Sequence, residues 1–104
     1  MIYTFTNDER LGIKLPLLEQ SWNNYTKETQ ELILAEWETI RGKIPDRIKE
    51  LENEINDRQS QLYQEEDFER SCELNSEISE LASIINDLWI WYRANNHITQ
   101  KGHY

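Results

Sequence analysis

Residues 48–92 read IKELENEINDRQSQLYQEEDFERSCELNSEISELASIINDLWIWY, and this stretch decides the fold. Its apolar residues form two rows with steps of three and four. The first row is Ile48, Leu51, Ile55 and Leu62, with Arg58 at one position, and the second is Leu74, Ile78, Leu81, Ile85, Leu88 and Tyr92. Such steps place each row on one face of a helix, as in a coiled-coil seam. The sequence therefore predicts two long amphipathic helices.

A charged break at residues 64–67 separates the two rows. Asp67 can cap a new helix with its side chain, and Glu69 lies favourably in the first turn of that helix. Two helices joined by so short a link fold back antiparallel and bring their apolar rows together. We therefore predict a helical hairpin over residues 45–95, with one continuous helix through the break as the alternative.

The second helix is the longer one, because residues 67–94 span about 42 Å and residues 45–64 roughly 30 Å at 1.5 Å per residue. Its overhanging end is apolar all round, so another part of the chain or a second chain must cover it. Trp89 and Trp91 are two positions apart and cannot point the same way. One faces the bundle, and the other meets the N-terminal arm, a second subunit or a partner.

The N-terminal part of the chain can supply this cover. Residues 1–16 are β-branched and aromatic at their start, and read either as a small β-hairpin or as an extended arm that packs on the apolar end of the last helix. Pro16 to Asn24 is expected to form a short helix. Thr26 can cap a further helix that ends at Gly42. Pro45 then indicates a turn into the next helix, with a colinear kink as the alternative.

These elements predict an all-α protein with a single helical domain. It consists of a short non-helical N-terminal arm (1–16), one or two N-terminal helices (17–42), the helical hairpin (45–95) and a polar tail (96–104). A chain of 104 residues buries only a small core, which favours oligomerisation. We expect a homodimer in which a second copy covers the hairpin, forming a four-helix bundle.

The charge of the chain is negative and concentrated in one place. Residues 46–80 hold 12 acidic and 4 basic side chains, which is −8 of the net charge of −9. This excess argues against direct binding to nucleic acid or to an anionic membrane and favours a basic partner. The N-terminus lacks the features of a secretory signal, no apolar run approaches the ~20 residues of a membrane span, and Cys72 is the only cysteine. We expect a cytoplasmic protein.

The sequence contains no catalytic motif, and we expect no catalytic residue, metal or cofactor. His97 and His103 both lie in the tail, far from Cys72, so ligands with metal-binding spacing are missing. Cys72 has Glu69 and Glu73 near it, and these acids disfavour a thiolate nucleophile. We expect Cys72 to be a half-buried packing residue. The three glycines are isolated and form no phosphate-binding loop.

Residues 48–55 read IKELENEI and residues 68–81 read FERSCELNSEISEL. Together they resemble the UVR motif (Ile-x-x-Leu-Glu-x-x-Met, then Phe-Glu-x-Ala-Ala-x-Leu-Arg-Asp-x-Ile-x-x-Leu), the helical hairpin of the bacterial excision-nuclease subunits UvrB and UvrC and of some Clp-associated regulators. The positions in register include Phe68, Glu69, Leu74, Ile78 and Leu81. Asn75-Ser76 replaces the family's Arg-Asp pair, and the halves lie about one helical turn further apart. The resemblance implies a hairpin that docks on another protein. The acidic hairpin is also similar to the C-terminal coiled coil of some ABC-F ATPases.

We therefore expect a non-enzymatic protein–protein interaction module, an adaptor or a regulator, that binds itself and another protein. Its expected contacts are Phe68, Glu69, Leu74, Trp89 and Trp91. One alternative is an acidic mimic that blocks a basic nucleic-acid-binding surface of its partner, which predicts binding that weakens steeply with salt. The other is a small-molecule sensor or enzyme with an aromatic pocket near Trp37 and Trp91.

Overall fold

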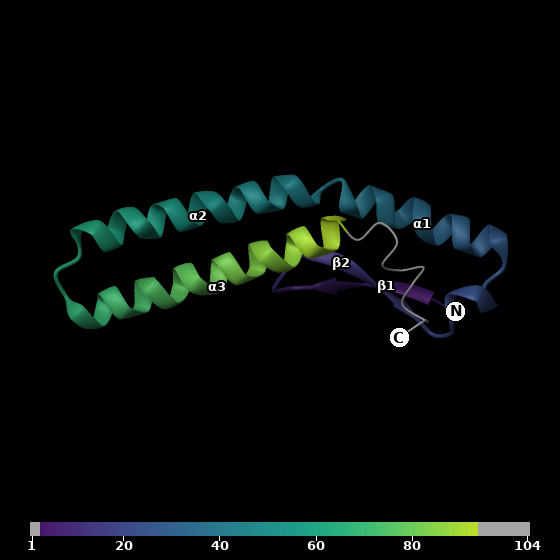
Figure 1. The fold of residues 1–104 in the computed structure, drawn as a ribbon, viewed down its shortest axis with the longest axis horizontal. Helices are drawn as coiled ribbons and strands as arrows, with labels where there is room; N and C mark the ends of the chain where they lie inside the picture. Colours follow the sequence, from purple (N-terminus) through teal and green to yellow (C-terminus); the bar gives the residue numbers. More distant parts are fainter. Residues whose placement is uncertain (1–2, 94–104) are drawn as a thin grey trace.

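The computed structural model describes residues 3–93. The elements follow in the order β1 (Tyr3–Asp8), β2 (Ile13–Leu18), a 3-10 turn η1 (Trp22–Asn24), α1 (Lys27–Arg41), α2 (Ile44–Gln64) and α3 (Phe68–Arg93). Helices α2 and α3 lie side by side as a long helical hairpin, and α1 and the two strands gather at one end of it (Figure 1). We call this end the base and residues 63–69 at the other end the tip. The molecule measures 59 × 23 × 21 Å along its principal axes.

The predicted all-α class is wrong, because residues 3–18 form a two-stranded antiparallel sheet. Of the two readings of the N-terminal arm, the β-hairpin is the one found. Its turn depends on Gly12, whose φ of 76° is a left-handed conformation that glycine adopts without steric cost. The Gly12 N–H donates to the Asp8 carbonyl at 2.8 Å, and the Leu11 N–H donates to the Asp8 side chain at 2.9 Å. Local hydrogen bonds therefore close the turn.

The expected helix from Pro16 to Asn24 is also wrong. Residues up to Leu18 belong to β2, and only residues 22–24 form a single 3-10 turn. The strand is the more stable structure here because β2 pairs with β1 along its whole length, from Tyr3 opposite Leu18 to Asp8 opposite Ile13. A short helix has no comparable source of stability, since helix nucleation is costly.

Helices α1 and α2 meet at a bend rather than at the reversing turn expected from the sequence (Figure 1). Gly42 and Lys43 both keep right-handed helical backbone angles, so the chain continues forward. Pro45 in the first turn of α2 has no N–H to donate to the preceding helix, which interrupts the ladder. The Gly42 N–H still donates to the Glu38 carbonyl at 3.0 Å. The junction between α1 and α2 is therefore the kink that the sequence left as the alternative to a turn.

The predicted helical hairpin is confirmed, and the alternative of one continuous helix is excluded. The chain reverses at residues 65–67, and α2 and α3 pack along their length. Asp67 caps α3 as expected, because its side chain accepts a hydrogen bond from the Glu69 N–H at 3.2 Å. Leu51 and Leu74, one from each apolar row, are completely enclosed between the helices.

The hydrophobic core lies at the base, where α3 overhangs the start of α2. Leu88 near the end of α3 is fully buried in a cluster with Ile33 and Trp37 of α1. Leu11 and Ile13 of the β-hairpin belong to the same cluster. The N-terminal arm therefore covers the apolar end of the last helix, as the sequence predicts.

Candidate interaction surface

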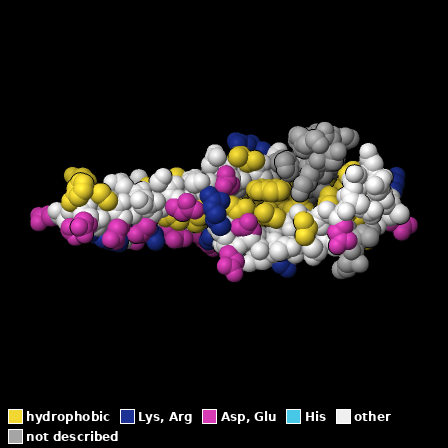
Figure 2. Space-filling view, turned by 90° about the horizontal axis from the view of Figure 1, so that it is seen from below, with side chains coloured by type: hydrophobic (Ala, Val, Ile, Leu, Met, Phe, Trp, Pro, Cys, Tyr) yellow, Lys and Arg dark blue, Asp and Glu magenta, His cyan; other side chains and the backbone are white. Residues whose placement is uncertain are grey.

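The tip carries an aromatic pair that nothing in the described chain covers. Tyr63 lies at the end of α2 with 93% of its surface exposed, and Phe68 begins α3 with 79% exposed. They are the two most exposed large hydrophobic residues among those described. Figure 2 shows a hydrophobic patch at this end of the molecule with acidic side chains beside it. Single exposed apolar residues are ordinary, but two at one end of a helical hairpin form a patch, which makes the tip a candidate interaction surface.

Acidic side chains hold the backbone of the tip in place. A carboxylate oxygen of Glu65 accepts a hydrogen bond from the Asp67 N–H at 3.1 Å, and Asp67 in turn caps α3. Leu74 lies fully buried about two turns beyond Asp67 along α3. The aromatic pair is thus mounted on an ordered turn, which lowers the entropy that binding must remove.

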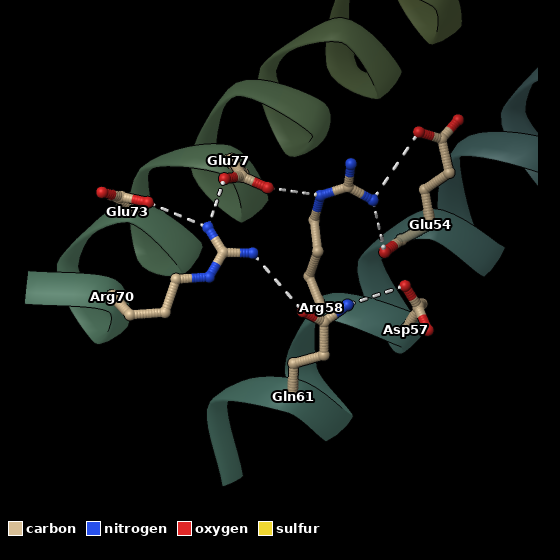
Figure 3. Close-up of polar contacts among 7 residues, drawn as sticks. All are labelled: Glu54, Asp57, Arg58, Gln61, Arg70, Glu73 and Glu77. Atoms are coloured by element: carbon tan, nitrogen blue, oxygen red, sulfur yellow. Dashed lines mark hydrogen bonds and ion pairs between the residues drawn. The ribbon is translucent and has the colours of Figure 1, made fainter. Parts of the chain in front are cut away.

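An ion-pair network crosses the helical hairpin below the tip (Figure 3). Arg58 takes a position of the first apolar row, and its Nε donates to an Oε of Glu77 on α3 at 2.9 Å. Its Nη1 turns back to Glu54 of α2, where it donates to the carbonyl at 3.3 Å and lies 3.7 Å from the carboxylate. A charged pair at an otherwise apolar position favours one register of two helices over others.

Arg70 extends this network on the α3 side. It donates to Glu73 at 3.0 Å, to Glu77 at 3.2 Å and to Gln61 at 3.4 Å (Figure 3). Hydrogen bonds from Arg58, and secondly from Arg70, hold the pKa of Glu77 below its usual value. Both arginines of the outer hairpin are therefore paired with acids. The exposed Glu66 and Glu69 at the tip have no ion-pair partner among residues 3–93, so the tip keeps its negative charge.

The five residues expected as contacts fall into two groups. Phe68 and Glu69 are both exposed at the tip, whereas Leu74 is buried between the helices and can support the tip without reaching a partner directly. Trp89 and Trp91 lie at the base. Trp91 packs edge-to-face on Trp37 with ring centres 5.5 Å apart, as expected of the tryptophan that faces the bundle. Trp89 remains 37% exposed, and its contact with a second subunit or a partner stays a prediction.

Two features of the tip region differ from the sequence reading. Tyr63 was not among the expected contacts, because it lies one residue outside the apolar row that ends at Leu62. Its position directly before the charged break, next to the reversal of the chain, is the signal that could have identified it. Cys72 was expected to be half-buried but is exposed. It precedes Leu74 by two residues, and a side chain two positions from a buried one lies on another face of the helix.

A groove lies at the base, and no tryptophan lines it. It has a volume of about 770 Å³ and separates the turn of the β-hairpin from the bend between α1 and α2. Ile13 and Ile40 supply apolar lining, and Lys43, Asp46 and Arg47 supply charges of both signs. The alternative reading placed an aromatic pocket near Trp37 and Trp91, but Trp37 is buried in the core and neither tryptophan lines this groove.

No group of three or more potential metal ligands is gathered within residues 3–93, and both histidines lie outside the described residues. None of the helices described has the length and apolar content needed to cross a membrane. Comparison of the chain with protein-family models, with curated proteins and with solved structures found no match. The likeness to the UVR hairpin therefore depends on the quoted residues alone.

Proposed function

We propose that the protein is a non-enzymatic protein–protein interaction module that binds its partner with the tip of the helical hairpin. The observation that carries this proposal is the exposure of Tyr63 and Phe68 together at one turn. Aromatic side chains offer a large contact area at low entropic cost and dominate the binding energy of many interfaces. The UVR-like pattern of residues 48–81 implies the same docking role.

The sides of the helical hairpin expose few large apolar residues, which favours the tip as the contact surface. Ile55 and Ile78 of the apolar rows are half-buried between the helices, and the exposed positions around them are mainly polar. Among the described residues of α2 and α3, the only other exposed large hydrophobic side chains are those of Trp89 and Ile90, which lie at the base and are less exposed than the aromatic pair. A partner that needs apolar contact therefore finds it at the tip.

The proposal can be tested by affinity capture from the native host. The wild-type chain is compared with a Tyr63→Ser/Phe68→Ser variant and with a Leu17→Ser/Leu32→Ser control, which removes two exposed apolar residues from the base. We expect proteins that bind the wild type and the control but not the tip variant. Capture of the same proteins by all three chains would contradict the proposal. Circular dichroism verifies that each variant is folded.

The acidic mimic is a second candidate, and the pairing of Arg58 and Arg70 favours it, because the remaining carboxylates are uncompensated. In a Glu66→Gln/Glu69→Gln variant, a mimic loses most of its affinity, and its wild-type binding falls steeply with added salt. Docking through the aromatic pair should change little in either test. The two measurements on one captured partner therefore separate the candidates.

A homodimer through the helical hairpin, as the sequence predicts, is a separate candidate for self-association. The apolar rows cover each other more completely than the sequence implied, and Ile55, Ala82 and Ile85 beside a shallow groove of about 580 Å³ are the surface left for a second hairpin. Two acidic hairpins repel each other when they pack side by side. Ile55→Glu should dissociate such a dimer in sedimentation, and a dimer that persists in this variant is held elsewhere.

A further inference from the structure

β1 is the open strand of the two-stranded sheet. Among the helices, α1 lies along β2, and β2 is the only described element that pairs with β1 (Figure 1). Thr4, Thr6 and Asn7 of β1 are exposed. The outer edge of β1 is therefore uncovered by residues 3–93.

The pairing with Pro16 shows which backbone groups point outward from this edge. Pro16 stands opposite Phe5, and proline occupies a strand where its nitrogen faces away from the neighbouring strand. In an antiparallel ladder, hydrogen-bonded and non-hydrogen-bonded pairs alternate. Tyr3 and Asn7, two positions to either side of Phe5, therefore share its orientation. The N–H and C=O groups of these three residues point away from β2.

The two edges of the sheet are protected to different degrees. The β2 edge carries Pro16, which has no N–H, and Lys14, whose charge opposes the approach of another strand. The residues from Tyr3 to Asn7 include no proline and no charge. Natural sheets block exposed edges by these means, so the unblocked β1 edge is suited to accept a further strand.

The β1 edge is complementary to itself. When a second β1 runs antiparallel with Phe5 opposite Phe5, Tyr3 of each copy stands opposite Asn7 of the other, and each outward N–H meets an outward carbonyl. The Phe5 side chains then become a cross-strand aromatic pair. Because β1 runs roughly along the long axis of the molecule (Figure 1), antiparallel pairing directs the two helical hairpins in opposite directions. The two acidic helical hairpins then lie far apart, so their mutual repulsion is weak.

We propose that the β1 edge binds the β1 edge of a second copy of this chain, which forms a four-stranded antiparallel sheet. The interface is separate from the tip and leaves Tyr63 and Phe68 of both copies free. It also differs from a dimer through the helical hairpin, because the residues that hold it together lie in the first strand.

Amide hydrogen exchange of the wild-type chain at micromolar and at millimolar concentration tests the proposal directly. We expect the N–H groups of Phe5 and Asn7 to exchange about tenfold or more slowly at the high concentration, because they become hydrogen-bonded in the dimer. The Thr6 N–H, which points towards β2, should be protected at both concentrations. The outward Lys14 N–H on the other edge should show no such concentration dependence. Equal exchange at Phe5 and Asn7 at both concentrations overturns the proposal.

Sedimentation of two variants at one position gives an independent test. Asn7→Pro removes an outward N–H, whereas Asn7→Ala removes the side chain and keeps the N–H. We expect the wild type and Asn7→Ala to double the 12.6 kDa mass of the chain at high concentration and Asn7→Pro to remain monomeric. A monomeric wild type, or a dimer that persists in folded Asn7→Pro, overturns the proposal. The exchange measurement decides the matter if Asn7→Pro does not fold.

Discussion

The guanidinium of Arg10 donates to a carboxylate oxygen of Asp87 at 2.7 Å and joins residues 77 positions apart in the chain. The same side chain donates to Glu80 at 3.0 Å and to Ser83 at 2.9 Å, so one residue of the β-hairpin turn spans two turns of α3. Hydrogen bonds from Asp87, and secondly from Glu80, raise the pKa of Arg10. The β-hairpin is therefore attached to α3 by a group that stays charged.

Arg10→Ala should loosen the β-hairpin without unfolding the helices. We expect amide exchange to accelerate in β1 and β2 and to change little in the middle of α3, because exposed ion pairs contribute modestly to global stability. Lys14→Ala is the control, since Lys14 is also an exposed cation of the β-hairpin but forms no ion pair among the described residues. Equal acceleration in both variants would show that the contacts of Arg10 are not responsible.

The two glycines at the base should respond oppositely to alanine. At Gly12 the left-handed backbone costs a residue with a Cβ about 1–2 kcal/mol. The new Cβ would also lie 2.5 Å from Arg47 Nε, which donates to the Leu11 carbonyl at 3.0 Å. At Gly42 the backbone is helical, and the new Cβ would lie 3.4 Å from the Glu38 carbonyl oxygen, an ordinary contact.

Urea denaturation followed by circular dichroism compares these variants. Gly12→Ala should be less stable than the wild type by at least about 1–2 kcal/mol. Gly42→Ala should be unchanged or more stable by up to about 1 kcal/mol, because alanine lowers the entropy of the unfolded chain. A loss at Gly42 as large as that at Gly12 would mean that the bend between α1 and α2 requires glycine.

Phe68 and Leu74 belong to the same helix but should differ sharply in their effect on stability. Leu74→Ala leaves a cavity between α2 and α3 and should cost about 2–5 kcal/mol. Phe68→Ala removes a side chain that solvent already surrounds, so its effect should stay within about 0.5 kcal/mol. The free energy of unfolding of the two variants is the measurement. A large loss for Phe68→Ala would indicate that the tip is covered in solution.

Glu77 should give the stability of the protein a dependence on acid pH. Its pKa is lower in the folded chain than the reference value of 4.5, so its contribution is complete above pH 4.5 and is lost as the pH falls through the lower folded value. The Glu77→Gln variant should lack this contribution to the free energy of unfolding at neutral pH. The difference in free energy of unfolding between the variant and the wild type should shrink below pH 4.5. Glu52→Gln removes an exposed carboxylate that forms no described ion pair and should leave the profile unchanged. Parallel pH profiles for the wild type and Glu77→Gln would refute this role.

The helical hairpin could be predicted because its signals are local. Residue steps of three and four, the capping group of Asp67 and the absence of glycine and proline from residues 48–92 all indicate the same structure. The helix that begins after Thr26 was predicted for the same reason, and the Thr26 side chain does accept from the Thr29 N–H at 3.2 Å. Each of these features depends on residues within one turn of one another.

The β-hairpin and the bend could not be predicted with the same success, because non-local contacts decide them. Pro16 is typical of the start of a helix, but it is also compatible with β2, because its nitrogen faces away from β1 and no hydrogen bond between the strands is lost. Gly42 reads as the end of a helix before a turn, yet its helical backbone lets α2 continue forward. Tyr63 could not be identified in this way, because apolar rows at helical spacing mark residues that become buried, and a contact surface consists of apolar residues that remain exposed.

The helical hairpin has two separate attachments to the base. One is the bend at Gly42 and Lys43, and the other is the set of contacts that Arg10 and Arg41 make with α3, where Arg41 lies 5.1 Å from the centre of the Tyr92 ring. With the bend alone, the helical hairpin could rotate about residues 42 and 43. Because α3 is also held at the base, the helical hairpin can tilt only if α2 and α3 slide along each other. The direction in which the aromatic pair faces is therefore set at the opposite end of the molecule, by the buried cluster around Leu88 together with these arginines.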